Sequence, residues 1–185
     1  MKKSGFTLIE LIVSIGIIAM MTGIFLANYS TANRRTDLTM TAQKMVSDIR
    51  MAQNYSLGLA RYGASGTSHV PPGGWGIHFD LAANNQYTLF ADDNDNTIFN
   101  SGEDDLGSGA QTTALPTNVI IDSIKGPLAM TAVDVTFLPP DPITTITNRT
   151  NMATSSQVDI SLKDLKSGTY KTVRINYLGL AEVID

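Results

Sequence analysis

The sequence predicts an α+β fold in which a long N-terminal helix, with a membrane half and an amphipathic half, packs on a mostly antiparallel β-sheet or a small β-sandwich. Two observations carry this prediction. Apolar residues dominate residues 6–27 and then recur with helical spacing up to Leu59. From Trp75 onward, apolar and polar residues alternate in short stretches separated by turn residues, which is typical of antiparallel strands.

The composition narrows the classes of protein that the chain can belong to. It has 185 residues, a formal net charge of −4 and no cysteine. The lack of cysteine excludes a disulfide scaffold, cysteine-ligated zinc and thiol catalysis. The acidic balance disfavours a strongly basic nucleic-acid-binding protein. The sequence contains no phosphate-binding loop, dinucleotide fingerprint or nucleophile elbow, so we predict that the protein is not an enzyme.

The N-terminal apolar segment is long enough to cross a membrane. Residues 6–27 contain a single charged residue, Glu10. As a helix this segment is roughly 33 Å long, which matches the hydrocarbon core of a bilayer. A secretory signal peptide has a shorter apolar stretch. We therefore predict a transmembrane helix over residues 6–28.

Glu10 is the residue that a plain membrane anchor does not explain. A carboxylate at bilayer depth costs about 2.5–3.5 kcal/mol on insertion scales. Residues that carry such a cost generally have a partner and a function. The sequence therefore predicts that something pairs with Glu10.

The helix is predicted to continue beyond the membrane as an amphipathic segment over residues 29–62. Between Leu38 and Ala52 apolar positions follow a spacing of four and three residues, which marks one face of a helix. We expect a single helix from about Phe6 to about Arg61, with this face against a sheet. Glycine, serine and proline residues after Arg61 end the helix, and residues 63–185 are predicted to form a globular β-rich domain.

The first strands are predicted as a hairpin over residues 75–91. Apolar residues occupy alternate positions from Trp75 to Phe79, and Asn84-Asn85 supplies the turn. His78 is one of the alternating polar residues, so we expect it on the exposed face of its strand.

The remaining strands are predicted from similar alternation further along the chain. They are residues 118–124, 132–137, 157–162 and 170–177, with a short final strand within 178–184. The segment 139–156 is rich in threonine, asparagine and proline, and we predict that it forms a long exposed loop.

The first ten residues, MKKSGFTLIE, combine several specific features. A basic start is followed by Gly5, the aromatic residue Phe6 and, four positions further, Glu10, and a long apolar run then begins. This combination resembles the N-terminus of type IV pilins and of type II secretion pseudopilins.

The resemblance implies a processing step. A prepilin peptidase would cut between Gly5 and Phe6 on the cytoplasmic side, and the same enzyme would N-methylate Phe6. Residues 1–5 would then be a leader peptide. The new amine of Phe6 would pair with the Glu10 carboxylate, usually that of a neighbouring subunit, which makes Glu10 an assembly residue and not a catalytic one.

The resemblance also implies a function as a structural subunit. Residues 42–53 are most similar to the helix of H-type minor pseudopilins and of the related T-type minor pilins. The expected role is that of a minor pseudopilin of a type II secretion pseudopilus or a minor pilin of a type IV pilus. Two alternatives remain open: a major pilin, and a membrane-tethered calcium-binding or adhesive module that does not assemble.

The partners and location follow from the same resemblance. The partners would be other pilin or pseudopilin subunits, the prepilin peptidase, an inner-membrane assembly platform and, before assembly, membrane lipid. The chain would be a single-pass protein of the bacterial inner or cytoplasmic membrane, with its globular domain outside the cytoplasm and in a filament after assembly. Nucleic-acid binding is not expected, because Leu180 follows Gly179 where some T-type pilins carry arginine.

An acidic segment over residues 92–103 fits a twelve-residue calcium loop, which makes Ca²⁺ a candidate cofactor. Its oxygen ligands would come from positions 1, 3, 5, 7, 9 and 12, which are Asp92, Asn94, Asn96, the Ile98 carbonyl, Asn100 and Glu103. Thr97 stands at position 6, where such loops usually carry glycine. The alternative is a solvated acidic loop with no metal.

Overall fold

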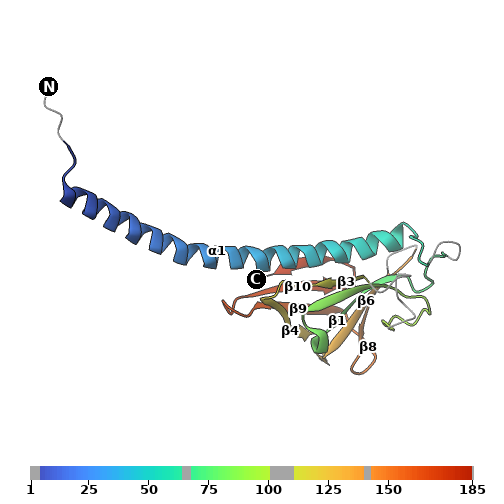
Figure 1. Cartoon of the computed structure of the whole chain (residues 1–185). Helices are drawn as coiled ribbons and strands as arrows, with labels where there is room; N and C mark the ends of the chain where they lie inside the picture. Colours follow the sequence, from blue (N-terminus) through green and yellow to red (C-terminus); the bar gives the residue numbers. More distant parts are fainter. Residues whose placement is uncertain (1–4, 64–67, 101–110, 140–142, 185) are drawn as a thin grey trace. The chain divides into compact units, whose positions relative to one another are not determined.

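We analysed a computed structural model of the whole chain, which describes residues 5–63, 68–100, 111–139 and 143–184 (Figure 1). In the first of these ranges, the side chains of residues 27–35 are not described. The chain divides into two compact units, Met1–Thr36 and Asp37–Asp185. We describe each unit by itself.

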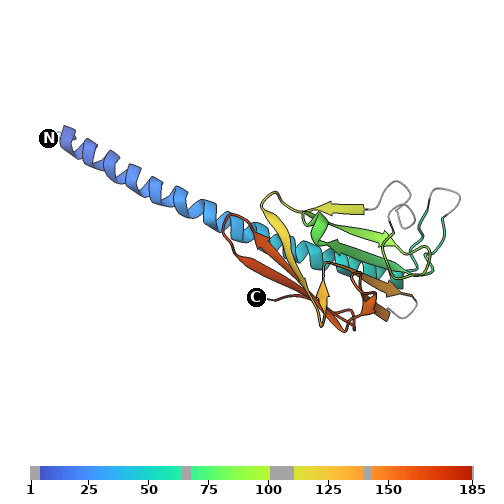
Figure 2. The same ribbon diagram turned by 90° about the horizontal axis from the view of Figure 1, so that it is seen from below.

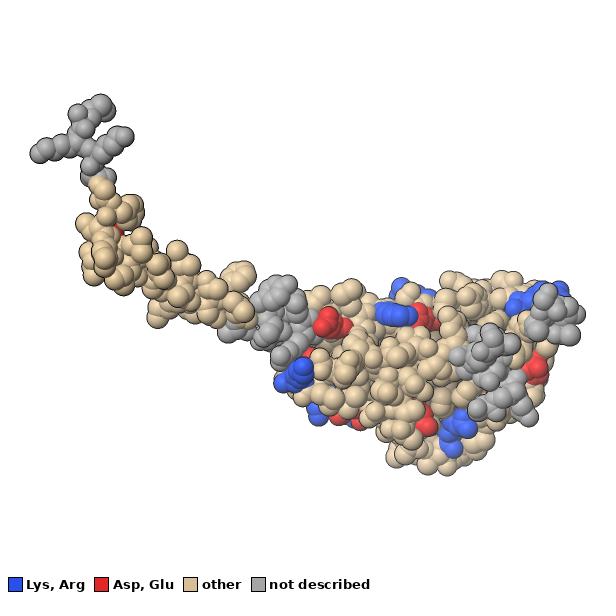
Figure 3. Space-filling view, in the orientation of Figure 1, with Lys and Arg blue, Asp and Glu red and all other residues tan. Residues whose placement is uncertain are grey.

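The first unit contains the N-terminal part of helix α1 (Leu8–Leu57). The stretch Leu8–Leu26 has a mean hydropathy of 2.3 and is long and apolar enough to cross a membrane. None of it is buried by the described residues, and the face of it seen in Figure 3 carries no basic side chain. A helix that is apolar on every side needs lipid or other apolar helices around it.

In the second unit, α1 turns one apolar face towards the β-strands. The residues of this face are Leu38, Ala42, Met45, Ile49 and Ala52, and each is at most 2% exposed. The predicted spacing of four and three residues is therefore confirmed as the buried face of the helix. The helix ends at Leu57, slightly earlier than the predicted end near Arg61.

A buried hydroxyl fastens this end of the helix to the strands. Ser56 is 1% exposed, and its Oγ donates to the carbonyl of Phe137 and accepts the Trp75 N–H at 3.1 Å. The Trp75 indole N–H donates to the Ala60 carbonyl at 3.2 Å, and its ring meets Tyr55 edge to face. Because these contacts reach two different strands, they set the position of the helix end on the sheet.

Two antiparallel sheets make up the rest of the second unit. Among the described residues, the first sheet has the order β3 (Gln111–Ala114), β2 (Gln86–Ala91), β1 (Trp75–Asp80), β6 (Ala132–Leu138), β7 (Ile143–Asn148) and β8 (Ala153–Thr154). The second has the order β11 (Ala181–Ile184), β10 (Tyr170–Asn176), β9 (Gln157–Asp164), β4 (Val119–Lys125) and β5 (Ala129–Met130). Figure 2 shows the two sheets side by side in front of the helix. The predicted α+β fold, a long helix on antiparallel strands, is confirmed.

The predicted hairpin over residues 75–91 is also confirmed, with one addition. A short 3₁₀ helix, η1 (Leu81–Ala83), lies between β1 and β2. The Asp80 carboxylate caps it by accepting the Ala82 N–H at 2.8 Å. The inward residues of both strands, among them Ile77 and Phe79, join the core between helix and sheets.

The prediction of a long exposed loop over residues 139–156 is wrong. This segment contains β7 and β8, and residues 140–142 lie outside the described part of the chain. Three residues of β7 that face inward or pack against neighbours, Ile146, Thr147 and Asn148, are 1%, 4% and 0% exposed. The strand was missed because most of its buried side chains are polar, whereas the alternation rule looks for apolar ones.

Candidate functional site

The first turn of α1 holds Glu10 in a reciprocal cap. Thr7 precedes the helix, and its Oγ1 accepts the Glu10 N–H at 3.3 Å. The Glu10 carboxylate lies 3.4 Å from the Thr7 amide nitrogen and 3.3 Å from the Thr7 hydroxyl. This is the capping box that a Thr-x-x-Glu sequence forms at a helix start. The sequence analysis missed Thr7, although the spacing of these two residues is a known signal for such a cap.

The other hydroxyl groups of the apolar segment are also satisfied within the helix. Ser14 Oγ donates to the Glu10 carbonyl at 2.7 Å, and Thr22 Oγ1 donates to the Ile18 carbonyl at 2.8 Å. In hydrocarbon an unsatisfied polar group costs several kcal/mol. These internal bonds therefore make the segment compatible with lipid despite its polar residues.

Glu10 lies close to the bond at which cleavage is predicted. Its carboxylate reaches the amide nitrogen of Thr7, the residue directly after Phe6. Phe6 itself is 78% exposed and precedes the helix. A helix N-terminus carries partial positive charge, so a carboxylate in the first turn is favourable there. The arrangement can hold a cation at the edge of the apolar segment.

Packing does not explain the glycine at position 5. A Cβ built on Gly5 would meet no other atom within 4 Å. The roles predicted for Gly5, Phe6 and Glu10 in cleavage, methylation and assembly remain predictions, because a single chain does not test them.

The acidic loop after β2 is built around the carboxylate of Asp92, which is fully buried. One of its oxygens accepts the Asn96 N–H at 3.2 Å and the other accepts the Thr97 N–H at 2.7 Å. Burial raises the pKa of the Asp92 carboxyl, and the loop amides oppose that rise. The loop therefore folds back on its own first residue.

Thr97 has a left-handed backbone conformation, with φ of 62°. This is the position where a calcium loop usually carries glycine, and a β-branched residue is strained there. The Thr97 hydroxyl lies 3.2 Å from that of Thr147 in β7, which helps to hold the turn. The loop thus adopts a left-handed conformation at this position without the glycine that usually allows it.

The structure places only part of the predicted calcium ligand set. Glu103 lies outside the described residues. The side-chain oxygen of Asn96 accepts the Ile98 N–H at 2.8 Å, and the Ile98 carbonyl accepts the Asn100 side-chain amide at 3.2 Å. Within the described ranges, no group of three or more His, Cys, Asp or Glu side chains gathers to hold a metal ion. The calcium site remains a prediction.

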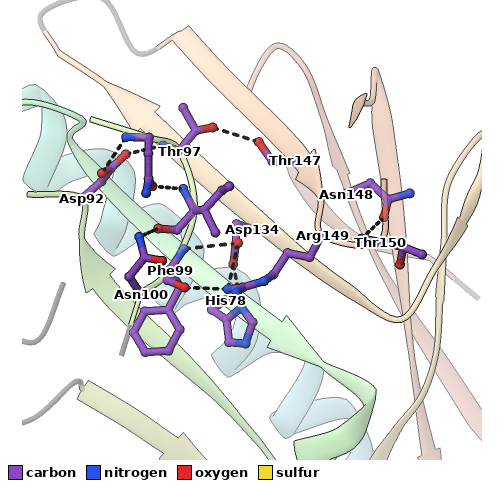
Figure 4. Close-up of polar contacts among 12 residues, drawn as sticks. His78, Asp92, Thr97, Phe99, Asn100, Asp134, Thr147, Asn148, Arg149 and Thr150 are labelled. Carbon is purple, nitrogen blue, oxygen red and sulfur yellow. Dashed lines mark hydrogen bonds and ion pairs between the residues drawn. The ribbon is translucent and has the colours of Figure 1, made fainter. Parts of the chain in front are cut away.

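A buried ionic network fastens this loop to the first sheet (Figure 4). Asp134 of β6 is fully buried, and its carboxylate lies 2.6 Å from His78 Nδ1 and 3.4 Å from Arg149 Nη1. It also accepts the Phe99 N–H at 3.2 Å. Arg149 donates to the Phe99 carbonyl at 2.6 Å, and the Phe99 ring stacks on His78 at 4.9 Å.

The expectation that His78 lies on an exposed face is therefore wrong, because its side chain is only 14% exposed and pairs with Asp134. The partners come from β1, β6 and the segment after β7, and no short-range pattern joins them. We assign this network to loop attachment, because Asp134 accepts the Phe99 N–H and Arg149 donates to the Phe99 carbonyl, and Phe99 lies in the acidic loop.

The comparisons with known proteins concern the N-terminus. Residues 1–26 match the family model of the prokaryotic N-terminal methylation motif. No curated protein and no solved structure matches the chain. This motif indicates a prepilin of the type IV pilin-like kind. The motif, together with the apolar helix that contains it, supports a place for this chain among type IV pilin-like proteins.

Proposed function

We propose that the chain is a minor pseudopilin of a type II secretion pseudopilus or a minor pilin of a type IV pilus. It is cut between Gly5 and Phe6 and N-methylated at Phe6. The observation that carries the proposal is the match of residues 1–26 to the methylation motif, which lies on a helix whose apolar residues find no cover within the chain.

The exposed apolar segment is suited to two successive environments, first the lipid bilayer and then the helices of other subunits. Before assembly, lipid covers Leu8–Leu26, a stretch long enough to span the bilayer core. After extraction, the same residues pack against the helices of other subunits. Lipid and helix surfaces are about equally apolar, so van der Waals packing and polar contacts decide between the two states.

In this proposal, Glu10 fixes the axial register between the helices of neighbouring subunits. Its capping contacts with Thr7 satisfy the carboxylate while the leader is still attached. Cleavage creates a cationic amine on Phe6. In a low-dielectric core, leaving one member of an ion pair without its partner costs about 3–5 kcal/mol. Helix staggers that bring an amine next to Glu10 are therefore favoured over those that do not.

The free space around Gly5 supports processing as the reason for the glycine. Because a side chain at this position would touch nothing in the chain, neither packing nor contact requires glycine. A peptidase that reads a small residue before the cleaved bond supplies such a requirement.

The test is the processing state of the full-length chain in cells that contain a prepilin peptidase. We expect the mature chain to begin with N-methylated Phe6, as shown by mass spectrometry of its N-terminal peptide. A Gly5→Leu variant should retain its leader, whereas the control Gly16→Ala, at another glycine with free space around it, should be processed normally. A wild-type chain that still begins at Met1 would contradict the proposal.

Filament content separates the alternatives that the sequence left open. A minor subunit should be a small fraction of the protein in sheared surface filaments, whereas a major pilin would dominate their mass. A membrane-tethered module that does not assemble would be absent from filaments, although it is processed.

A further inference from the structure

The bond at which cleavage is proposed lies just outside a long helix. Gly5, Phe6 and Thr7 have no regular secondary structure, and α1 begins at Leu8. Phe6 is 78% exposed, and a Cβ built on Gly5 would meet no atom within 4 Å. The conformation of the Gly5–Phe6 bond therefore depends on what fixes the start of the helix.

Thr7 and Glu10 fix this helix start. The Thr7 carbonyl accepts the Leu11 N–H at 3.2 Å, as the carbonyl of an N-cap residue does. The Thr7 Oγ1 accepts the Glu10 N–H at 3.3 Å, and the Glu10 carboxylate lies 3.4 Å from the Thr7 amide nitrogen. This set of bonds requires Thr7 to be the residue directly before the helix. It therefore favours a start at Leu8 over every other start.

A helix that began earlier would take up the bond to be cut. The Thr7 side chain would then lie inside the helix and lose its capping contacts. The groups of the Gly5–Phe6 peptide would enter the helical hydrogen-bond pattern, and the helix would have to unwind before a peptidase could bind this bond. When unwinding is fast, the rate of proteolysis follows the population of the unwound form. The cap thus favours the conformation in which the bond is accessible.

The apolar segment gives the helix a reason to extend. The first four N–H groups of any helix lack partners within it. Here they lie at the start of Leu8–Leu26, the segment that is long and apolar enough to span a membrane. Unsatisfied N–H groups are costly in hydrocarbon, so an extension that moved them away from the apolar segment would be favourable. The capping box instead satisfies the N–H groups of Thr7 and Glu10 where they are.

We propose that Thr7 is a positioning residue for processing, because its cap keeps the Gly5–Phe6 bond outside the helix and open to a peptidase. This inference rests on the proposed function. The reaction is a hydrolysis in which water adds across the Gly5–Phe6 amide and leaves a carboxylate on Gly5 and an amine on Phe6. Thr7 acts on this reaction through the helix start and not through contact with the reacting atoms.

The experiment measures initial rates of cleavage of the full-length chain in lipid vesicles by a prepilin peptidase. Thr7→Val keeps the shape of the side chain but removes the hydroxyl, and it should slow cleavage by up to about fivefold. Thr7→Asn changes the shape but keeps a strong N-cap, and it should be cut at least as fast as the wild type. A peptidase that recognised the shape of this side chain would give the reverse order.

Two matched controls separate the cap from other properties of the helix. The Thr22 hydroxyl donates to the Ile18 carbonyl within the helix, so Thr22→Val should be cut at the wild-type rate. Glu10→Gln removes the charge but keeps a side chain that completes a capping box. It should also be cut at the wild-type rate, although it lacks the anion that the proposed function requires for assembly.

A second measurement tests the conformational cause without a peptidase. In the uncleaved chain in detergent micelles, the Cα chemical shifts of Gly5 and Phe6 report whether these residues are helical. They should be non-helical in the wild type and in Thr7→Asn, and they should move towards helical values in Thr7→Val. Hydrogen exchange of the Thr7 amide is not needed for this comparison, because the shifts report the backbone directly.

The outcomes separate this inference from the proposed function. A wild-type chain that is cut after Gly5, with Thr7→Val cut equally fast, would overturn the role of the cap alone. Cleavage of Thr7→Asn as slow as that of Thr7→Val, or an equal slowing of either control, would do the same. Unchanged chemical shifts in Thr7→Val would also overturn it. A wild-type chain that no prepilin peptidase cuts would overturn the proposed function and this inference with it.

Discussion

The two parts of α1 use apolar residues in opposite ways. From Leu8 to Leu26 every side chain is exposed, whereas from Leu38 to Ala52 one face is buried against the strands of the second unit. The second part has its packing partner in the same chain. None of the first part is buried among the described residues, and a helix that is apolar on every side needs lipid or other apolar helices around it. One helix thus joins a segment whose apolar side chains are exposed to a segment whose apolar face is buried within the second unit.

The largest expected difference between the two parts is in the free energy of unfolding lost when an isoleucine is replaced by alanine. Ile49 is fully buried, so Ile49→Ala should lower the free energy of unfolding of the second unit by about 2–5 kcal/mol. Ile17 is 55% exposed, and Ile17→Ala should leave that free energy unchanged. Denaturant unfolding of both full-length variants in detergent micelles measures the two effects. Equal losses would show that the first part also contributes to the folding of the second unit.

Two serines, one in each part of α1, allow the same comparison of effects on the stability of the second unit. Ser56→Ala should destabilise the second unit by about 1–3 kcal/mol, because it leaves the Trp75 N–H and the Phe137 carbonyl without their buried partner. Ser14 donates only to its own helix and is exposed. Ser14→Ala should therefore leave thermal unfolding of the second unit as it is in the wild type. A neutral Ser56→Ala would disprove the fastening role of this hydroxyl.

Calcium tests whether the second unit also has a partner outside the chain. If the loop that begins at Asp92 binds Ca²⁺, a free concentration of ten times the Kd should stabilise the unit by about 1.4 kcal/mol. Calorimetry and thermal unfolding at millimolar CaCl₂, with MgCl₂ as control, measure this. Absence of both heat and stabilisation would remove the predicted site. Asn100→Ala should weaken a genuine effect.

The smallest expected effect is a pH dependence confined to the second unit. Arg174 donates to both oxygens of Asp159 at 2.8 Å, which lowers the pKa of that carboxyl. The stability that this pair contributes is present above the pKa of an unfolded aspartate, about 3.9, and is lost as the pH falls through the lower folded value. Arg174→Met should reduce stability at neutral pH, and its difference from the wild type should vanish in acid.

Asp92 should show the opposite trend. Burial raises the pKa of its carboxyl, so its contribution to stability is present below the pKa of the unfolded chain and is lost as the pH rises through the folded value. Urea unfolding of Asp92→Asn from pH 3 to 7 measures this. A stability difference from the wild type that does not change with pH would show that Asp92 keeps an ordinary pKa.

The features that depend on neighbours along the chain were predictable. A long apolar run located the first part of α1 and helical spacing located the second. Alternation located the hairpin of β1 and β2, and the N-terminal motif lies within ten consecutive residues. The capping box of Thr7 and Glu10 was equally readable, because its two residues are three apart. Local backbone geometry decides each of these, and local geometry is encoded in short spacings.

Other features depend on residues that meet only in the folded chain. The strand β7 carries polar side chains inward, and Asp134 joins His78, Phe99 and Arg149 from separate segments. By itself, the sequence determined the apolar N-terminal helix, its motif, the buried face of the second part of α1 and the hairpin of β1 and β2. The tertiary structure decided which strands pair and how the acidic loop is attached to the first sheet. Side chains that are far apart in the sequence share no periodicity from which their contact could be predicted.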